Sequence, residues 1–304
     1  MATNGNIIIP QTGKLTPEQK EQRKHGQPIF PIEKYGTQLW SEYPFVPPHW
    51  HEEAEFTFIR KGHCTYQIQL QSFEVSEGDL IFVPPTQLHS ITVSEEEMES
   101  DTFVFHMHFL GAGSGDICGI RYLTPLMNQV LIPPFIIRKE FPIYDEALRS
   151  FEDIDEAWTL RQTGFELVVK SALLRLISLL LPYCIESSKV PAIQTEHSFK
   201  LKTALEYIGE HYTENISIAD VAASCYFSEY HFMRFFKKYV GMSCFDYIKN
   251  YRLEKAAELL ESGDTSILDA SLASGFHNLS YFYREFKEKY GMTPKEWVKR
   301  NYSH

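Results

Sequence analysis

The C-terminal third of the chain repeats itself, and this repeat limits the possible folds more than any other feature. Residues 217–220 read SIAD and return 49 residues later as SILD at 266–269. Each copy places an acid three residues after a serine, the pattern of a reciprocal cap at the start of a helix. Residues 232–237 read FMRFFK and return 50 residues later as FYREFK at 282–287. Such repetition indicates one supersecondary unit used twice.

Each copy has the pattern of a helix-turn-helix motif, in which a short helix and a tight turn precede a second helix. The first copy predicts a helix from residue 218, a turn at 225–227 and a second helix that begins at Ser228. The second copy predicts a turn at 275–276 and a second helix from Asn278. Serine and asparagine are both favourable N-cap residues, which supports these starting points.

The second helix of such a motif can enter the DNA major groove, which is about 12 Å wide. Arginine can bridge two acceptors on guanine, and lysine suits phosphates. The positions predicted to contact DNA are Ser228, Tyr230, His231, Met233, Arg234, Lys237, Asn278, Ser280, Tyr281, Tyr283, Arg284 and Lys287. The opposite faces are predicted to be core, at Phe232, Phe236, Phe282 and Phe286.

Two other interpretations of the repeat are a plain helical bundle with a solvated basic face and a scaffold that binds protein. The doubled pattern with matched caps favours DNA binding over both. Residues 199–300 resemble the DNA-binding domain of the AraC/XylS family of bacterial transcription regulators. The stretch GFHNLSYFYREFKEKYGMTPKEW at 275–297 is similar to the signature segment of that family.

The resemblance implies two recognition helices in successive major grooves, about 34 Å apart on one face of the duplex. It also implies a homodimer, a cupin-like N-terminal sensor for a small molecule, and contact with RNA polymerase if the protein is an activator, the more usual outcome in the family. Tyr226 departs from the pattern, because the first turn often has glycine there. This departure bears on the geometry of the turn.

A second pair of motifs lies in the N-terminal part, where residues 47–62 read PPHWHEEAEFTFIRKG. His49, His51 and Glu55 are separated by even numbers, so on one strand their side chains would share a face. The arrangement HxH-x3-E-x6-G, followed by G-x5-P-x4-H ending at His89, resembles the two motifs of the cupin barrel. The sequence departs from those motifs at Tyr43, Thr86 and Val93.

In metal-binding cupins the residues that match His49, His51, Glu55 and His89 hold one metal. Three imidazoles and a carboxylate suit Mn, Fe, Ni or Zn. The alternative interpretation is therefore a divalent-metal cupin fused to a DNA-binding domain, either a metal-dependent sensor or an enzyme such as a dioxygenase or isomerase.

The favoured interpretation is a regulator without enzymatic activity or a required cofactor. Its effector would be a sugar or a related polar metabolite, because imidazoles and carboxylates hydrogen-bond hydroxyl groups and aromatic rings stack on sugar faces. The residues predicted to line the effector pocket are His49, Trp50, His51, Glu55, His89, His106 and His108. The last two share one face of a predicted strand in FVFHMHF.

Together these features predict an α+β multidomain protein. It has a cupin-like β-barrel with a helical dimerisation segment, then an all-α tandem helix-turn-helix domain. The predicted boundaries are a flexible arm at 1–28, the effector-binding barrel at 29–115, the dimerisation segment at 116–185, a linker at 186–198, and the AraC-type DNA-binding domain at 199–304.

Residues 145–182 predict a helix with a wide apolar stripe. The stripe consists of Phe165, Val168, Val169, Leu173, Leu176 and Leu180. We expect it to form the dimer interface, and the alternative is that it packs only on its own barrel.

The net charge of −11 lies entirely in the N-terminal two-thirds of the chain. Residues 199–304 have 14 basic and 14 acidic residues, whereas residues 1–198 have 15 and 26. This modestly favours approach of the C-terminal part to a polyanion such as duplex DNA. Five cysteines without a CxxC pair predict reduced, buried thiols. With no apolar run long enough for a bilayer or a signal peptide, we expect a cytoplasmic, nucleoid-associated protein without a membrane partner.

Overall fold

The structure is a computed structural model, and it describes residues 7–8, 25–41, 44–93, 97–189, 192–261 and 265–301. The chain divides into two compact units with the boundary between residues 195 and 196. All described strands lie in the first unit, and the elements that the structure describes in the second unit are all helices. This division confirms the predicted class, a β-rich domain followed by an all-α domain.

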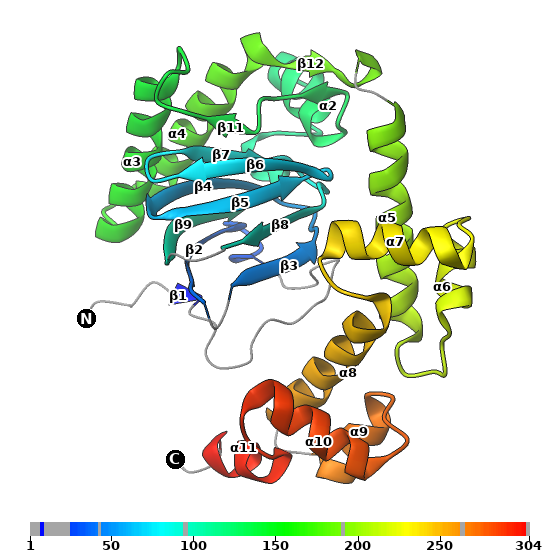
Figure 1. Ribbon diagram of the computed structural model, residues 1–304. Coiled ribbons are helices and arrows are strands. Elements are labelled where there is room, and N and C mark those ends of the chain that lie inside the picture. The colour runs from blue at the N-terminus through cyan, green and yellow to red at the C-terminus, as the bar shows by residue number, and fades with distance from the viewer. Residues whose placement is uncertain are drawn as a thin grey trace. The chain divides into compact units, whose positions relative to one another are not determined.

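Two sheets form the barrel-like part of the first unit (Figure 1). The strand order of the larger sheet is β1 (Ile7–Ile8), β2 (Ile32–Leu39), β9 (Met98–Phe105), β4 (Ala54–Lys61), β7 (Leu80–Val83) and β11 (Ile136–Ile137). That of the smaller sheet is β3 (Phe45–His49), β8 (His89–Thr92), β5 (His63–Ile68) and β6 (Gln71–Ser76). Buried residues from both sheets, among them Ile59, Tyr66 and Ile91, form one apolar cluster.

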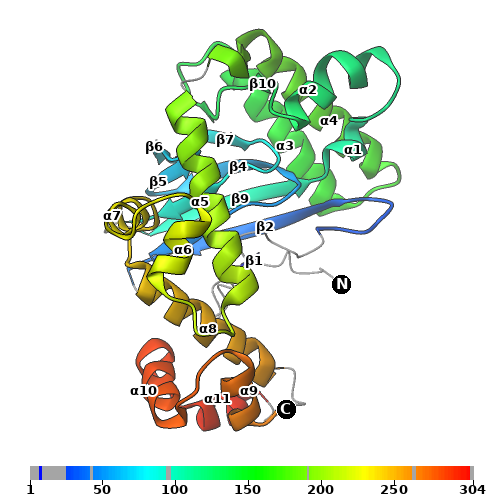
Figure 2. The same cartoon turned by 90° about the vertical axis from the view of Figure 1, so that its right-hand side faces the viewer.

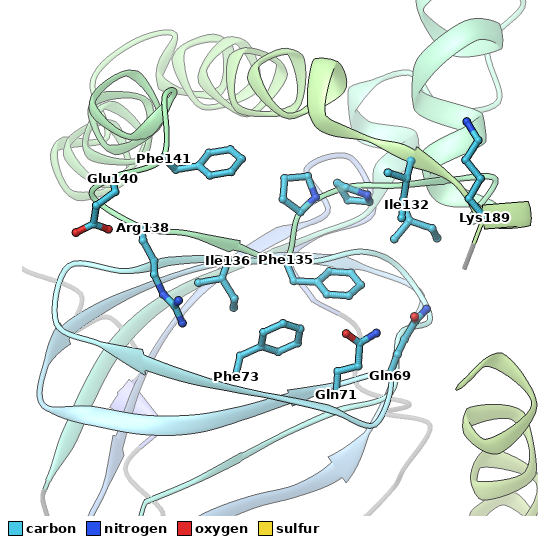
Figure 3. Close-up of a pocket in the computed structure, with 13 residues that line it drawn as sticks. Gln69, Gln71, Phe73, Ile132, Phe135, Ile136, Arg138, Glu140, Phe141 and Lys189 are labelled. Atoms are coloured by element: carbon cyan, nitrogen blue, oxygen red, sulfur yellow. The ribbon is translucent and has the colours of Figure 1, made fainter. Parts of the chain in front are cut away.

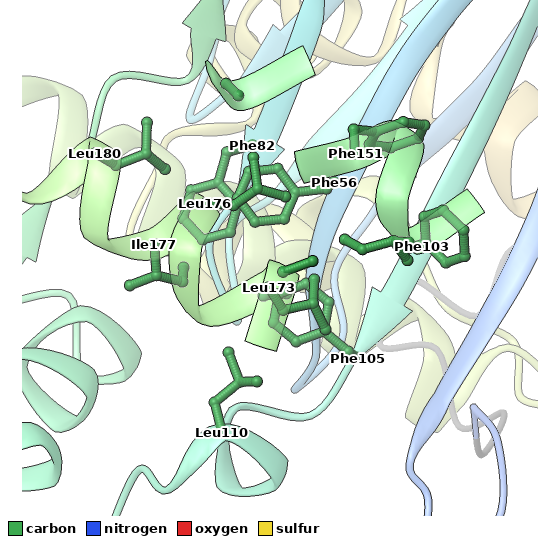
Figure 4. Close-up of a cluster of buried hydrophobic side chains, with 14 of the residues drawn as sticks. Phe56, Phe82, Phe103, Phe105, Leu110, Phe151, Leu173, Leu176, Ile177 and Leu180 are labelled. Atoms are coloured by element: carbon green, nitrogen blue, oxygen red, sulfur yellow. The ribbon is translucent and has the colours of Figure 1, made fainter. Parts of the chain in front are cut away.

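The larger sheet packs its second face against two helices, α3 (Tyr144–Leu160) and α4 (Phe165–Leu180). Figure 4 shows four phenylalanine rings of the sheet beside leucines of α4. These rings, from Phe56, Phe82, Phe103 and Phe105, are fully buried. Burial of each such side chain stabilises the fold by about 1.5–3 kcal/mol. Because strands alternate their faces, this packing leaves Glu55 and Thr57 of β4 on the opposite side, inside the barrel.

The helical segment differs from its prediction in two ways. It is not one helix, because the chain breaks at residues 161–164, where Arg161 and Gly164 have φ angles of 49° and 85°. The predicted dimer stripe also lies mainly inside its own domain. Its members Val169, Leu173, Leu176 and Leu180 are at most 1% exposed and belong to the cluster of the sheet phenylalanines. Only Val168 of the stripe is clearly exposed, at 45%.

The segment before α3 is less helical than predicted. It contains the short helices α1 (Met107–Leu110) and α2 (Thr124–Met127), the π-helix η1 (Gly119–Leu123), and β11. Strand β10 (Leu131–Ile132) of this segment pairs with β12 (Ile185–Glu186). The predicted linker is shorter than expected, because the 3-10 turn η3 (Ser187–Lys189) and α5 (Ala192–His211) occupy most of it.

The predicted flexible arm is only partly described. Ile7–Ile8 form strand β1, which pairs in parallel with β2, and residues 25–28 are also described. Residues 1–6 and 9–24 of the arm lie outside the described residues. Of the five cysteines, Cys64, Cys225 and Cys244 are buried as predicted, whereas Cys118 is exposed. Among the described residues, no helix combines the length and apolarity that a membrane span requires.

Both helix-turn-helix units are present in the second compact unit. The first consists of α6 (Ile218–Ser224) and α7 (Glu229–Val240), and the second of α9 (Ile267–Ala273) and α10 (Leu279–Tyr290). Helix α8 (Cys244–Glu261) runs from the group of α5, α6 and α7 to the group of α9, α10 and α11 (Pro294–Asn301), as Figures 1 and 2 show. The four predicted core phenylalanines, Phe232, Phe236, Phe282 and Phe286, are fully buried.

The caps predicted from the repeat fix where these helices begin. Ser217 and Asp220 exchange both bonds of a capping box, and the Ser266 side chain accepts from the Asp269 backbone N–H. Ser228 precedes α7 as predicted, but its hydroxyl bonds the His231 ring at 3.1 Å and not the helix backbone.

The turns of the two motifs adopt the same left-handed backbone with different residues. Tyr226 has a φ angle of 60° and Gly275 has one of 86°. A Cβ at Gly275 would lie 2.6 Å from the Tyr212 carbonyl oxygen, so glycine is needed there. Tyr226 is 87% exposed, so its side chain meets no such barrier, but its backbone is strained.

Candidate functional site

The residues predicted to contact DNA lie on and just before α7 and α10. In the first helix-turn-helix motif all six predicted residues are exposed: Ser228, Tyr230, His231, Met233, Arg234 and Lys237. In the second motif Asn278, Ser280, Arg284 and Lys287 are exposed, whereas Tyr281 and Tyr283 are half-buried. Both tyrosines pack against the core cluster of α8, α9 and α10, so part of each ring serves packing.

The two arginines have different surroundings. The Arg234 guanidinium lies 5.8 Å from the centroid of the Tyr230 ring. Arg284 donates from Nε and Nη2 to Glu285 Oε1, at 3.1 and 2.9 Å. Glu285 is buried and also pairs with Lys249 Nζ at 3.0 Å. The sequence analysis did not single out this carboxylate, and nothing in the periodicity indicated that it orients Arg284.

The second candidate site is a cluster of polar residues inside the barrel. His49 ends β3, His51 lies in the corner that follows, Glu55 is on β4 and His89 begins β8. The prediction that one strand carries the first three on one face is therefore wrong. The chain turns between β3 and β4, and two strands of the small sheet and one of the large sheet bring the four residues together. One ligand atom from each residue lies within 4.8 Å of the others.

Backbone carbonyl groups orient all three imidazole rings. Nδ1 of His49, His51 and His89 bonds the carbonyl oxygens of Pro47, Glu53 and Gln87, at 2.9, 3.1 and 2.8 Å. Nε2 of His51 bonds Glu55 Oε1 at 2.8 Å, and Nε2 of His89 lies 3.6 Å from Glu55 Oε2. Because each Nδ1 faces a carbonyl acceptor, it carries a proton, which leaves a lone pair on Nε2 of His49. The hydrogen bond from His51 Nε2 to the Glu55 carboxylate needs a second proton on that ring, which a metal ion would have to displace.

The electrostatics favour one protonation state for the cluster. Burial and the neighbouring His89 and His51 lower the pKa of His49 to about 3. Burial by itself would raise the pKa of Glu55. The charge of His89 and the hydrogen bond with His51 outweigh that effect and hold this pKa well below its usual value. A neutral His49 beside an ionised Glu55 is the form that can ligate a cation or accept hydrogen bonds.

Other residues around the cluster were not found from the sequence. His25 is buried, its Nδ1 lies 2.8 Å from the Tyr35 hydroxyl, and its ring lies 5.7 Å from that of His51. No motif could reveal it, since it comes from the segment predicted to be a flexible arm. Trp50 was predicted to line the pocket, and it is 4% exposed.

His106 and His108 do not belong to this group. Strand β9 ends at Phe105, His106 caps α1, and His108 lies within that helix. Their rings stack at 4.8 Å on each other, and His108 Nδ1 bonds the Ala112 carbonyl oxygen. The predicted strand face is therefore wrong at these two histidines. The alternation that placed them together belongs to a helix start.

The arrangement in the barrel can do two things. Convergent Nε2 atoms and a carboxylate can ligate a divalent transition metal, and the Nδ1–carbonyl bonds are the outer contacts that usually orient metal-ligating histidines. The same groups can hydrogen-bond hydroxyls of a polar ligand. A β-rich domain with an enclosed polar site, joined to a domain with two exposed recognition helices, defines a DNA-binding regulator of two domains.

Comparisons with known proteins agree with this class. A family model described as an AraC-like ligand binding domain matches residues 41–119, and a model described as a helix-turn-helix domain matches residues 221–300. The chain belongs to the AraC family of transcription regulators, DNA-binding proteins with a ligand-binding domain.

Individual relatives match over most of their length. The HTH-type transcriptional regulator YdeC of Bacillus subtilis is 26% identical over 289 residues, which cover 93% of this chain and 96% of that protein. The melibiose operon regulatory protein of Escherichia coli K12 is 24% identical over 285 residues, covering 86% and 90%. Among solved structures, ToxT from Vibrio cholerae aligns with a TM-score of 0.41 and 15% identity, covering 88% and 97%.

Proposed function

We propose that this regulator reads operator DNA with α7 and α10 while its barrel senses a small polar metabolite, such as a sugar, at the histidine cluster. The observation that carries the sensing part is the gathering of His49, His51, Glu55 and His89 inside a barrel whose other buried residues are mainly apolar. Burying charged and polar groups is unfavourable unless they have partners. A polar group of this kind inside a sensor domain is therefore a candidate for ligand recognition.

On DNA, Arg234 and Arg284 read bases, and Lys237 and Lys287 contact phosphates. All four side chains are exposed on the two recognition helices. Glu285 restricts the Arg284 guanidinium, so less conformational freedom is lost when it meets a guanine. Binding of the metabolite changes operator affinity only if the two arrangements of the protein bind it with different strength.

The DNA-reading part is tested on a duplex selected from a random pool by the full-length protein. Arg234→Ala and Arg284→Ala should each weaken binding by about 1–3 kcal/mol, about five- to 150-fold. Lys238→Ala is the matched control, because Lys238 is an exposed basic residue of α7 that is not among the residues predicted to contact DNA. Affinity should also fall steeply with salt, since phosphate contacts release counterions. Unchanged affinity in both arginine variants would refute the assignment of the recognition helices.

A second candidate function is that the cluster holds a divalent transition metal, which would make the sensor metal-dependent. The specific observation in its favour is that all three Nδ1 atoms face carbonyl oxygens while Nε2 of His51 and His89 face Glu55. When bound, the metal would supply a Lewis-acid centre that an anionic or hydroxylated effector can ligate. His49, His51, Glu55 and His89 would hold it.

Elemental analysis separates the two forms of the site. The protein is purified without chelator or histidine tag, beside His51→Ala and a control, His63→Ala, which alters an exposed histidine of β5. About one Mn, Fe, Ni or Zn per chain, lost only in His51→Ala, would establish the metal form. Absence of metal from all three proteins would contradict it. A thermal-shift screen against monosaccharides would then test the metabolite directly, with His51→Ala as the variant that should not respond.

The same proposal includes a homodimer. The predicted stripe is buried, so we place the dimer contact at the exposed apolar residues around the break between α3 and α4. Leu160, Leu167 and Val168 are 54%, 74% and 45% exposed. Leu167→Glu should shift the protein towards monomer in analytical ultracentrifugation, and an unchanged mass would contradict this placement.

Transcription control is the function proposed for the whole chain, and catalysis is not. Its compared relatives are transcription regulators, and its barrel site is explained by recognition alone. As a regulator of promoters it would act on the nucleoid in the cytoplasm, and as an activator it would also contact RNA polymerase. Turnover of a ligand by the purified protein would overturn the assignment as a non-enzyme.

A further inference from the structure

A cavity lies in the first compact unit, apart from the histidine cluster (Figure 3). Its volume is about 740 Å³, within the range of small-molecule sites. The β5–β6 turn and β6 form one side, and residues 132–141 form another. Ile185 and Lys189 complete the lining, whereas none of the four cluster residues contributes to it. The cavity is therefore a separate place where a ligand could bind.

The middle of this cavity is apolar and aromatic. Figure 3 shows the Phe73 and Phe135 rings close together, with Phe141 across the cavity. The Phe73 and Phe135 ring centroids lie 6.0 Å apart in an edge-to-face arrangement. Phe135 is held by the sheet, because its carbonyl oxygen accepts from the Phe82 backbone N–H at 2.8 Å. A preformed aromatic surface of this kind suits a flat or branched apolar group.

Charged and amide groups lie at the margins of the cavity. Arg138 is 52% exposed, and its Nη2 donates to the Glu74 carbonyl oxygen at 2.6 Å while Nε lies 3.7 Å from Asp79. These contacts fix the guanidinium beside the cavity without enclosing it. Lys189, Gln69 and Gln71 also line the cavity, and Figure 3 places both glutamine amides on the side away from Arg138. Glu140 lies near Arg138 and is exposed.

The turn that carries Gln69 is strained. Strands β5 and β6 are joined by two residues, Gln69 and Leu70, with φ angles of 50° and 65°. Turns of this type normally use asparagine and glycine, and a left-handed conformation costs other residues about 1–2 kcal/mol each. Strain of this kind is concentrated at ligand sites and other functional positions. Here it accompanies a glutamine whose side chain lines the cavity.

From these observations we infer that the cavity binds a small organic anion with an apolar body, such as an aromatic carboxylate. The body packs on Phe73, Phe135 and Phe141, and the carboxylate accepts hydrogen bonds from Arg138. A bond between a guanidinium and a carboxylate is roughly twice as strong as a neutral one. The lining ends at Lys189, three residues before α5 begins at Ala192. A ligand in this cavity therefore contacts the chain just before α5, the helix that continues into the second compact unit from residue 196, independently of the histidine cluster.

The test uses the full-length protein and the fluorescent aromatic anion 1-anilinonaphthalene-8-sulfonate as the probe. The dye should bind saturably, and phenylacetate should displace it. Phenylacetamide, which has the same ring without the charge, should be about 10-fold weaker. Arg138→Gln should remove this preference for the acid, and Phe73→Ala should weaken both competitors. Arg175→Gln is the matched control, because Arg175 is another exposed arginine of the same unit that pairs with a carboxylate, that of Glu146.

Retained preference for the acid in Arg175→Gln, with its loss in Arg138→Gln, would support the inference. Equal displacement by the acid and the amide in the unmodified protein would overturn it, as would the absence of a saturable dye site. A preference that survives in Arg138→Gln would also overturn it. Arg138→Lys, which keeps the charge but not the planar fork, guards against a folding defect and should retain part of the preference.

Discussion

Leu173 of α4 provides the sharpest test of where the apolar stripe packs. Its side chain is fully buried in the cluster of the sheet phenylalanines, and Figure 4 shows it beside Phe105. Leu173→Ala should therefore destabilise the first unit by about 2–5 kcal/mol, the usual effect of truncating a buried leucine. For a unit of this size that corresponds to a fall in Tm of roughly 5–15 °C.

Ile120→Ala is the control, a truncation of an exposed apolar side chain of the same unit that lies outside the proposed dimer contact. Ile120 is 60% exposed, so this change should alter the free energy of unfolding by less than about 0.5 kcal/mol. Unfolding of the first unit can be followed by tryptophan fluorescence, because three of the four tryptophans, Trp40, Trp50 and Trp158, lie in this unit. Calorimetry of the full chain provides a second reading. An unchanged Tm in Leu173→Ala, together with dissociation of an oligomer, would show that the stripe packs between subunits.

Three further outcomes follow from the second unit. Tyr226→Gly should raise the free energy of unfolding by about 0.5–1 kcal/mol in urea titrations, because relief of the left-handed backbone exceeds the added entropy of glycine; a loss of stability would contradict the strain. Gly275→Ala should lower it by at least about 2 kcal/mol, since its Cβ would meet the Tyr212 carbonyl oxygen. Burial raises the pKa of Glu254 to about 7, despite its ion pair with Lys289. The folded state thus holds this proton more tightly than the unfolded state, so its contribution to stability should decline from the unfolded pKa up to about pH 7. Unfolding of Glu254→Gln measured across that range should lack this part of the decline, and identical pH profiles would refute it.

The helix-turn-helix units could be predicted because their signals are local. A serine cap, an acid three residues later and phenylalanines at helical spacing fix a short helix without help from distant residues. The structure accordingly places Ser217, Ser266 and the four core phenylalanines as expected. Ser228 shows the limit of this reasoning. Its predicted position at the helix start is confirmed, but its hydroxyl forms a hydrogen bond with the His231 ring and does not cap the helix backbone.

The four residues of the histidine cluster were named from the sequence, but their geometry was not foreseen, and His106 and His108 were wrongly added to them. Even spacing suggested one strand for His49, His51 and Glu55, yet a corner separates the first from the last. Pairing between strands decides such corners, and no short window of sequence contains that information. His25 was missed for a different reason, because it reaches the site from a segment without any motif.

The apolar stripe of α4 illustrates a different limit. Periodicity shows that one face of a helix is buried, but it does not identify the partner. The helix packs on its own sheet, and the residues left exposed lie around its beginning. His106 and His108 fail for a related reason, since alternation over a few residues fits both the end of a strand and the start of a helix.

The most direct measurement is methylation interference on the selected operator with the unmodified protein, Arg234→Ala and Arg284→Ala. Two recognition helices in successive major grooves predict two groups of sensitive guanines, about 10 base pairs apart on one face of the duplex. Each arginine variant should lose sensitivity in one group and keep the other. A single group of sensitive guanines, or a pattern that neither variant alters, would contradict DNA reading by α7 and α10.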